Sequence, residues 1–260
     1  MNNISKKERM VSYFYQHIVP IYFCFQKGDI KHQFIITSFA FSVSGYWFLI
    51  TAGHCFKLIR EEFIDNGWTL SSCSLIDFLG LNVKFMEPIP FNFDINKAYF
   101  FPENDDDYSF DYGVYPLSSY YKELLLANNI KSLNEEVWKK QPNHIDVCAI
   151  IGIPSELINF NHRVELVSCF LYADIIDEKP EGFKDTSLPR IYAKINLDNG
   201  MGSIEGISGG PLLGFQKLEN GELRYWLLGL QSRWYSPSQH IAACPTKILG
   251  LMLESTISKS

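Results

Sequence analysis

The sequence predicts an all-β fold with a short helical connector, and three observations lead to this prediction. Short stretches rich in Phe, Tyr, Ile and Val recur along the 260 residues, separated by Gly, Pro, Asn and Asp. Such stretches are typical of strands, and their spacing favours a sandwich or a barrel. Helical periodicity is confined to two segments. The composition, 47% hydrophobic and 20% charged, is ordinary for a soluble globular protein.

Eight stretches are expected to form strands. The dipeptide Asn220-Gly221 lies between the last two of them and is a strong signal for a hairpin turn. The expected strands are 18–25, 34–43, 46–51, 144–151, 164–173, 190–195, 211–215 and 224–230.

The two helical segments are a central connector and a C-terminal helix. Between residues 118 and 140, leucines and other apolar residues recur among Lys, Glu and Asn, as expected for one or two short helices. Residues 245–254 begin with a proline, which is common near the start of a helix.

Charge and cysteine content exclude several classes of protein. The net charge is −6 and no block of Lys and Arg stands out, so we expect no nucleic-acid or membrane partner. No apolar run reaches the length of a transmembrane helix, and no export signal precedes the first strand, so a cytoplasmic location is expected. The six cysteines are scattered without zinc-ligand spacing, which predicts reduced thiols and neither metal nor cofactor.

The candidate nucleophile is Ser208, in the sequence Gly206-Ile207-Ser208-Gly209-Gly210-Pro211. A serine hydroxyl needs a base to become reactive and a site that stabilises the oxyanion. The glycines permit a tight turn that can direct the N–H groups of Gly206 and Ser208 at one point. Taken alone, the motif is equally compatible with an ordinary glycine-rich turn.

His54 is the candidate base and Asp111 the candidate acid. His54 follows an apolar run and lies in Thr51-Ala52-Gly53-His54-Cys55. Asp111 is a single acid entering an apolar stretch, where its burial requires a partner. The competing run Asp105, Asp106 and Asp107 is more typical of a solvated loop.

These three motifs together resemble the trypsin/chymotrypsin-like serine peptidases, and the bacterial intracellular members more than the secreted ones. The order His54, Asp111, Ser208 fits that superfamily. The resemblance implies two antiparallel β-barrels: residues 12–118 carrying His54 and Asp111, a connector at 119–140, and residues 141–254 carrying Ser208.

The resemblance also implies roles for individual residues. Ser208 would be the nucleophile, His54 the base and Asp111 its partner, with Gly206 and Ser208 forming the oxyanion hole. A protein or peptide substrate would bind as an extended strand, and its contacts would include four residues, Gly202, Gln231, Ser232 and Arg233.

Two departures from the family pattern bear on regulation and specificity. Ile207 stands where the secreted enzymes carry an aspartate that pairs with a newly cut N-terminus, so activation by such a cut is not expected. Gly202 supplies no acid for a preference for Lys or Arg. Control by a regulatory partner or signal is therefore expected, and some bacterial relatives act in antiviral defence.

Two rival functions were weighed against this one. Gly206-x-Ser208-x-Gly210 also fits the nucleophile elbow of α/β-hydrolases, but that fold places its acid and histidine after the serine. Only His240 follows Ser208, without a suitable acid. The second rival is a catalytically silent or latent peptide-binding relative with the same fold, and no residue of the sequence excludes it.

Overall fold

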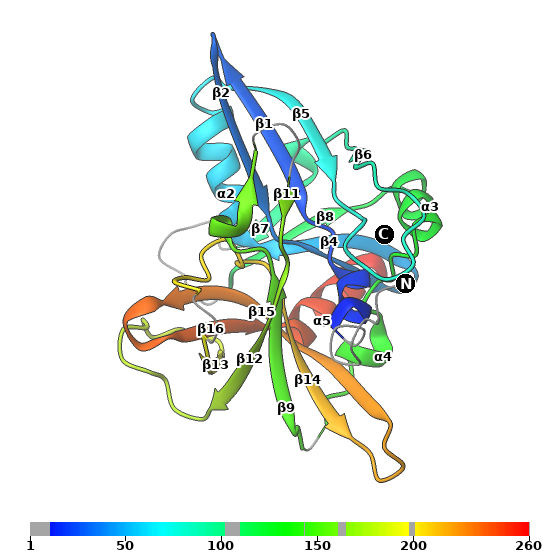
Figure 1. Ribbon diagram of the computed structural model, residues 1–260, viewed down its shortest axis with the longest axis vertical. Coiled ribbons are helices and arrows are strands. Elements are labelled where there is room, and N and C mark those ends of the chain that lie inside the picture. The colour runs from blue at the N-terminus through cyan, green and yellow to red at the C-terminus, as the bar shows by residue number, and fades with distance from the viewer. Residues whose placement is uncertain (1–10, 102–109, 143, 161–164, 198–200, 260) are drawn as a thin grey trace.

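The strands form two groups, one in the upper half of Figure 1 and one in the lower half. The structure is a computed structural model that describes residues 11–101, 110–142, 144–160, 165–197 and 201–259. The fold class predicted from the sequence is confirmed, since strands dominate both halves.

The N-terminal half contains two four-stranded antiparallel sheets around one hydrophobic core. Phe23 and Phe25 from the first sheet meet Leu49 and Tyr115 from the second in this core. In the part of the chain that is described, no ladder joins the two sheets, and they meet through the side chains of this core. In order, the first sheet is β2 (Ile30–Ile36), β1 (Ile21–Lys27), β5 (Thr69–Leu75) and β6 (Ile89–Pro90), and the second is β3 (Phe39–Val43), β4 (Tyr46–Ala52), β8 (Tyr112–Pro116) and β7 (Tyr99–Phe101).

The C-terminal half contains a closed six-stranded barrel, as predicted. The hairpin at Asn220-Gly221 is present: Gly221 has φ of 82° and its N–H donates to the Leu218 carbonyl at 2.8 Å. A separate two-stranded sheet pairs β10 (Ile158–Asn159) with β11 (Glu165–Leu166). The barrel order is β12 (Cys169–Ile176), β13 (Ile191–Ile195), β16 (His240–Pro245), β15 (Leu223–Tyr235), β14 (Pro211–Lys217) and β9 (Val147–Gly152).

Helices are short and lie at the connections. The predicted connector contains α3 (Ser119–Ala127) and α4 (Glu135–Trp138), and the predicted C-terminal helix is α5 (Thr246–Ile257), which packs against α4. A further helix, α2 (Gly53–Leu58), continues into the π-helical segment η2 (Ile59–Ile64). Single 3₁₀ turns are η1 (Tyr15–His17), η3 (Ile95–Lys97), η4 (Ser155–Leu157) and η5 (Ser236–Ser238).

The two halves share a second hydrophobic core. Phe41 and Ile50 from the N-terminal half pack with Ile151, Leu213 and Leu230 from the C-terminal half. The domain boundaries expected at residues 118 and 141 stay a prediction, because this shared core is continuous across them.

Some predicted elements need correction. Residues 34–43 form two strands in different sheets, because the chain turns at Thr37–Ser38. Residues 164–173 likewise divide between β11 and β12. Strands β5, β6, β7, β8, β10 and β16 and helix α2 lie outside the stretches predicted as strands and helices.

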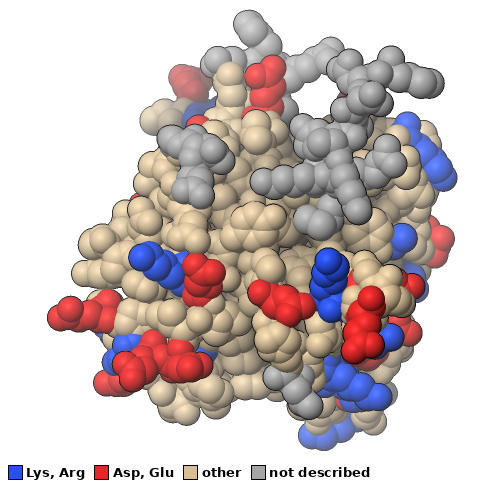
Figure 2. All heavy atoms as spheres, turned by 60° about the horizontal axis from the view of Figure 1, so that its bottom comes forward, with Lys and Arg blue, Asp and Glu red and all other residues tan. Residues whose placement is uncertain are grey.

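The remaining sequence-based expectations concern cysteines, membranes and charge. All six cysteines are free. Within the described ranges, no helix combines the length and apolarity needed to cross a bilayer. On the face shown in Figure 2, acidic and basic side chains are interspersed over a largely uncharged surface.

Candidate active site

His54 lies in the first turn of α2, directly after β4. The chain is still extended at Ala52 and becomes helical at Gly53. A side chain at residue 53 would collide with the Phe101 carbonyl and would lie 3.2 Å from Asp111 Oδ1. Glycine at this position therefore allows the backbone of His54 to approach the acid closely.

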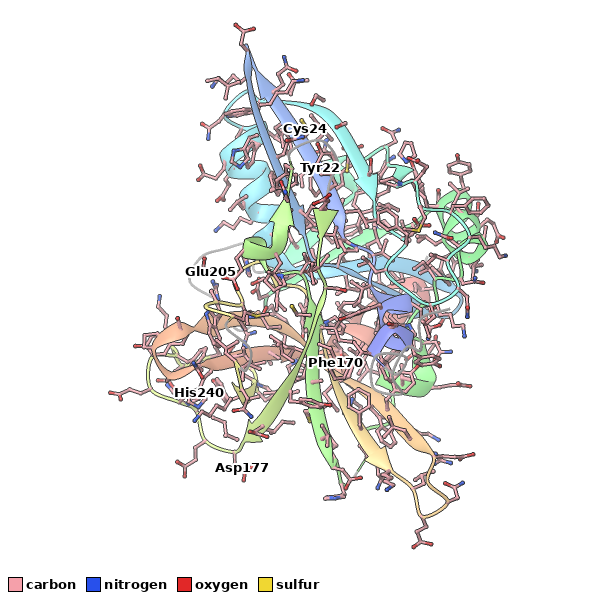
Figure 3. The ribbon with its side chains drawn as sticks, viewed as in Figure 1. Tyr22, Cys24, Phe170, Asp177, Glu205 and His240 are labelled. Atoms are coloured by element: carbon pink, nitrogen blue, oxygen red, sulfur yellow. The ribbon has the colours of Figure 1, made fainter. Side chains whose placement is uncertain are left out.

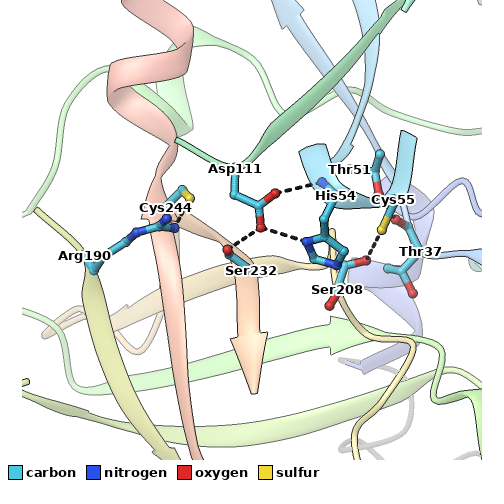
Figure 4. A network of polar contacts seen from close by, with 9 residues as sticks. All are labelled: Thr37, Thr51, His54, Cys55, Asp111, Arg190, Ser208, Ser232 and Cys244. Carbon is cyan, nitrogen blue, oxygen red and sulfur yellow. Dashed lines mark hydrogen bonds and ion pairs between the residues drawn. The ribbon is translucent and has the colours of Figure 1, made fainter. Parts of the chain in front are cut away.

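Asp111 immediately precedes β8, and the pairing of β8 with β4 places it beside His54. Its side chain is buried, with 1% of the residue exposed. Asp111 Oδ1 accepts from the His54 backbone N–H at 2.8 Å, and Oδ2 lies 2.8 Å from His54 Nδ1 (Figure 4). Because the carboxylate only accepts, Nδ1 carries the ring proton and Nε2 is left to act as a base.

Ser232, on β15 of the other half, completes the surroundings of the acid. Its hydroxyl donates to Asp111 Oδ2 at 2.5 Å, and the residue is buried. Ser232 was predicted as a substrate contact; its side chain instead bonds the acid, which leaves only its backbone for a substrate.

The two partners shift each other's pKa. Burial alone would raise the pKa of Asp111, but the His54 charge and the hydrogen bonds from His54 and Ser232 lower it. Burial alone would lower the pKa of His54, but neighbouring Cys55 and the Asp111 carboxylate raise it. The geometry thus stabilises the imidazolium that forms when Nε2 takes up a proton.

Ser208 lies in a turn held by backbone contacts and by Ile207. Gly206 and Gly209 have φ of 93° and 94°, a region that favours glycine. A side chain at Gly209 would collide with Thr51 Oγ1 and the Thr37 carbonyl. Ile207 is fully buried in the core of the C-terminal barrel, against Gly152, where no ion pair is required.

Two threonines connect this turn to the N-terminal half, and neither was predicted. The Thr51 hydroxyl donates to the Thr37 carbonyl at 2.7 Å. The Thr37 hydroxyl donates to the Gly206 carbonyl at 2.8 Å and accepts from the Ile153 N–H at 3.0 Å. Both threonines are buried, so the Gly206 peptide is oriented by a hydroxyl from the other half. The only feature of the sequence that could have indicated Thr37 and Thr51 is a hydroxyl-bearing residue within an otherwise apolar run.

His54, Gly206 and Ser208 line one cavity of about 430 Å³. Among the described residues, the N–H groups of Gly206 and Ser208 have no hydrogen-bond acceptor, so both are available to an oxyanion. The Ser208 hydroxyl makes no hydrogen bond to the His54 ring in the same described set, although Figure 4 shows the two side by side. The structure therefore brings the three predicted catalytic residues together, but no hydrogen bond joins the Ser208 hydroxyl to His54 among the described residues.

The other predicted substrate contacts are more dispersed. Gly202 is exposed and does not line the cavity of Ser208. Gln231 is fully buried, and its side-chain amide has no partner among the described residues. Arg233 is exposed on β15 and directly follows Ser232, the residue that bonds Asp111. The competing acids Asp105, Asp106 and Asp107 lie outside the described residues.

Two other histidines, His17 and His240, have contacts typical of structural positions. His240 lies in the C-terminal barrel (Figure 3), and its Nδ1 lies 2.7 Å from the hydroxyl of nearby Ser238. His17 is buried, bonds the Lys131 carbonyl, and has its pKa lowered by burial to about 4. The part of the chain that is described holds no group of three metal-ligating side chains.

Comparison with solved structures finds the same architecture in proteases. A thermostable serine protease, AL20, from an extremophilic microorganism has a TM-score of 0.50 and 17% identity, over 89% of this chain and 92% of that one. The inactivated protease paralogue S-I1 of the scabies mite has a TM-score of 0.55 and 13% identity, over 97% and 96%. No family model and no curated protein matches the sequence. Together with the sheet topology, these likenesses show that the chain has the fold of the trypsin- and chymotrypsin-like proteases.

Proposed function

We propose that this chain is a serine endopeptidase that hydrolyses peptide bonds in a protein substrate through an acyl-enzyme. The observation that carries the proposal is that His54, bonded to the buried Asp111, lines the same cavity as Ser208. A structural histidine would not need a buried carboxylate on Nδ1 together with an open cavity beside its ring.

The mechanism follows from the positions of the groups. Ser208 Oγ attacks the carbonyl carbon while His54 Nε2 takes its proton, and the imidazolium is stabilised by Asp111. The Gly206 and Ser208 N–H groups bind the oxyanion. His54 then gives the proton to the leaving amine, and a water molecule repeats the sequence to release the acyl group.

The substrate is proposed to bind as an extended strand along β15, where Ser232 and Arg233 would offer their backbone. The Gln231 backbone is already bonded to the serine turn, since its N–H donates to the Gly210 carbonyl and its carbonyl accepts from the Gly209 N–H, both at 2.8 Å. Gly202 is proposed as the floor of the pocket for the substrate residue before the scissile bond. Gln231 was predicted as a substrate contact, but its side chain is fully buried, so it would act on a substrate only through the backbone of its neighbours.

Control by a regulatory protein or signal is proposed because Ile207 is buried in an apolar core and cannot form an ion pair with a newly cut N-terminus. A role in bacterial defence remains a prediction from the resemblance. A cytoplasmic location and the absence of a nucleic-acid or membrane partner remain predictions from the composition and pattern of the sequence.

The direct test is reaction with a fluorophosphonate probe, followed by location of the adduct by peptide mapping. We expect labelling at Ser208 and none in Ser208→Ala. Denaturation of the protein before addition of the probe is the control, since it removes the activated hydroxyl. Labelling that survives denaturation or maps to another residue would refute the assignment.

A catalytically silent or latent peptide-binding protein is the second candidate, favoured by the missing hydrogen bond between Ser208 and His54. It predicts no fluorophosphonate adduct in the isolated chain. Labelling that appears only when a binding partner is added would identify the latent form.

A further inference from the structure

The cavity at Ser208 extends from the catalytic groups over an apolar wall. Its volume, about 430 Å³, is enough to enclose one large side chain. The wall is formed by β2, α2 and η2 of the N-terminal half. Besides His54, Gly206 and Ser208, its described lining residues are His32, Phe34, Ile35, Ile36, Cys55, Leu58, Glu62, Phe63 and Ser155.

Most of this wall is packed against the rest of the N-terminal half. The rings of Phe34 and Phe63 stack with centroids 5.2 Å apart, and Phe63 also stacks on Phe25 at 4.7 Å. Ile35 and Ile36 are buried at the end of β2. Leu58 differs, because 47% of it is exposed at the cavity edge. A ligand that covers Leu58 gains apolar burial without rearranging the wall.

The cavity lies on the opposite side of the His54 ring from β15. Figure 4 shows Asp111 and Ser232 on one side of the ring and Cys55 and Thr37 on the other. No residue of β15 is among the described lining residues. A substrate whose acyl portion pairs with β15 therefore continues past the scissile bond over this cavity.

We infer that the cavity binds an aliphatic or aromatic side chain on the first residue of the leaving group. The inference rests on the proposed function and adds a preference at one substrate position. The apolar wall favours such a side chain, and the Glu62 carboxylate disfavours an acidic one in the same place.

The test uses transfer of the acyl group to amines, which enter the leaving-group site in the reverse direction. A pool of N-acetyl amino-acid thiobenzyl esters forms the acyl-enzyme, so the unknown acyl preference does not matter. The amine nitrogen attacks the acyl carbon, the bond to Ser208 Oγ breaks, and His54 returns the amine proton to Ser208. We expect leucinamide and phenylalaninamide to compete with water about tenfold better than aspartic acid α-amide.

The matched variants are Leu58→Glu and Leu251→Glu. Both leucines lie on helices, and 47% and 44% of them are exposed. Leu58→Glu should lower the transfer to leucinamide about tenfold relative to hydrolysis, because it places a charge in the cavity. Leu251→Glu, on α5 and outside the cavity, should leave the ratio unchanged.

The outcomes separate the two proposals. A burst of thiol with equal transfer to all amines, or an unchanged ratio in Leu58→Glu, would overturn the apolar subsite and leave the peptidase assignment standing. A wild-type protein that forms no acyl-enzyme with any ester would overturn the proposed function and the subsite with it. Digestion of a peptide library should also give products with apolar residues at their new N-termini, in agreement with the expected preference for leucinamide and phenylalaninamide.

Discussion

The two sides of the candidate site differ in how completely they are bonded. The acid Asp111 receives three hydrogen bonds, two from His54 and one from Ser232. The Ser208 hydroxyl receives and makes none among the described residues, although the turn around it is firmly held by Thr37 and by buried Ile207. The charged pair is thus preorganised within the N-terminal half, whereas the nucleophile depends on how the C-terminal half presents it.

Replacement of the nucleophile should have the largest effect. Ser208→Ala removes the only group that can form the acyl-enzyme, so kcat should fall about 10⁵-fold or more while the unfolding midpoint stays the same. Peptide cleavage and thermal unfolding are the measurements. Ser236→Ala, at an exposed position, is the control. Cleavage by Ser208→Ala at the wild-type rate would refute the proposed mechanism.

Replacement of the acid should have the next largest effect. Asp111→Asn keeps the shape but no longer stabilises the imidazolium or fixes the tautomer, so kcat should fall about 10⁴-fold. The comparison is Asp107→Asn, from the competing acidic run. A larger loss of kcat in Asp107→Asn would show that the wrong acid was chosen.

The serine turn can be tested through two glycines that share a positive φ. Gly209→Ala should cost about 3 kcal/mol of unfolding free energy, from backbone strain and from collision with Thr51 and Thr37. Gly221 also has a positive φ but open space around it, so Gly221→Ala should cost only about 1 kcal/mol. Urea unfolding measures both, and equal costs would show that the turn is not tightly packed.

The hydroxyl that joins the halves should affect turnover more than substrate binding. Thr37→Val keeps the shape and removes the bond to the Gly206 carbonyl, so kcat should fall roughly tenfold to a hundredfold with little change in KM. Thr37→Ser should restore most of the rate. If valine and serine behave alike, the hydroxyl does not orient Gly206.

The pH dependence should report the state of His54. Because Cys55 and the Asp111 carboxylate raise the pKa of His54, its neutral imidazole should predominate only at a pH above 6.5, the ordinary pKa of histidine. Below that apparent pKa, kcat/KM should rise about tenfold per pH unit. Asp111→Asn should shift the rising limb to lower pH, and a rate that falls across this range would contradict the role of His54.

The sequence predicted the residues whose chemistry is carried by local motifs. His54 and Ser208 each lie in a short pattern, and Asp111 was identified as one acid entering an apolar stretch. Thr37 and the hydrogen bond from Ser232 were missed because each contact joins residues more than 100 positions apart. Residue type alone does not specify such contacts.

The same reasoning explains the errors in the fold. Strand β5 has the sequence TLSSCSL, and its serines conceal the alternation of a sheet with one solvated face. Helix α2 was missed because it begins directly at the end of β4, where the apolar run obscures the change from period two to a helical period. The break at Thr37–Ser38 was missed because residues on both sides of it are equally buried.

The hydrogen bond from Thr37 to Gly206 also makes the site responsive to mechanical separation of the two halves. Hydrogen bonds weaken sharply once donor and acceptor move beyond normal contact, so a displacement of about 1 Å suffices to release this 2.8 Å bond. The Gly206–Ile207 peptide would then lose this anchor, and the turn that carries the Gly206 and Ser208 N–H groups could shift away from the proposed oxyanion site. A regulator that moves the two halves apart across their shared core, which includes Phe41 and Leu213, would therefore be expected to change turnover without reaching the catalytic cavity.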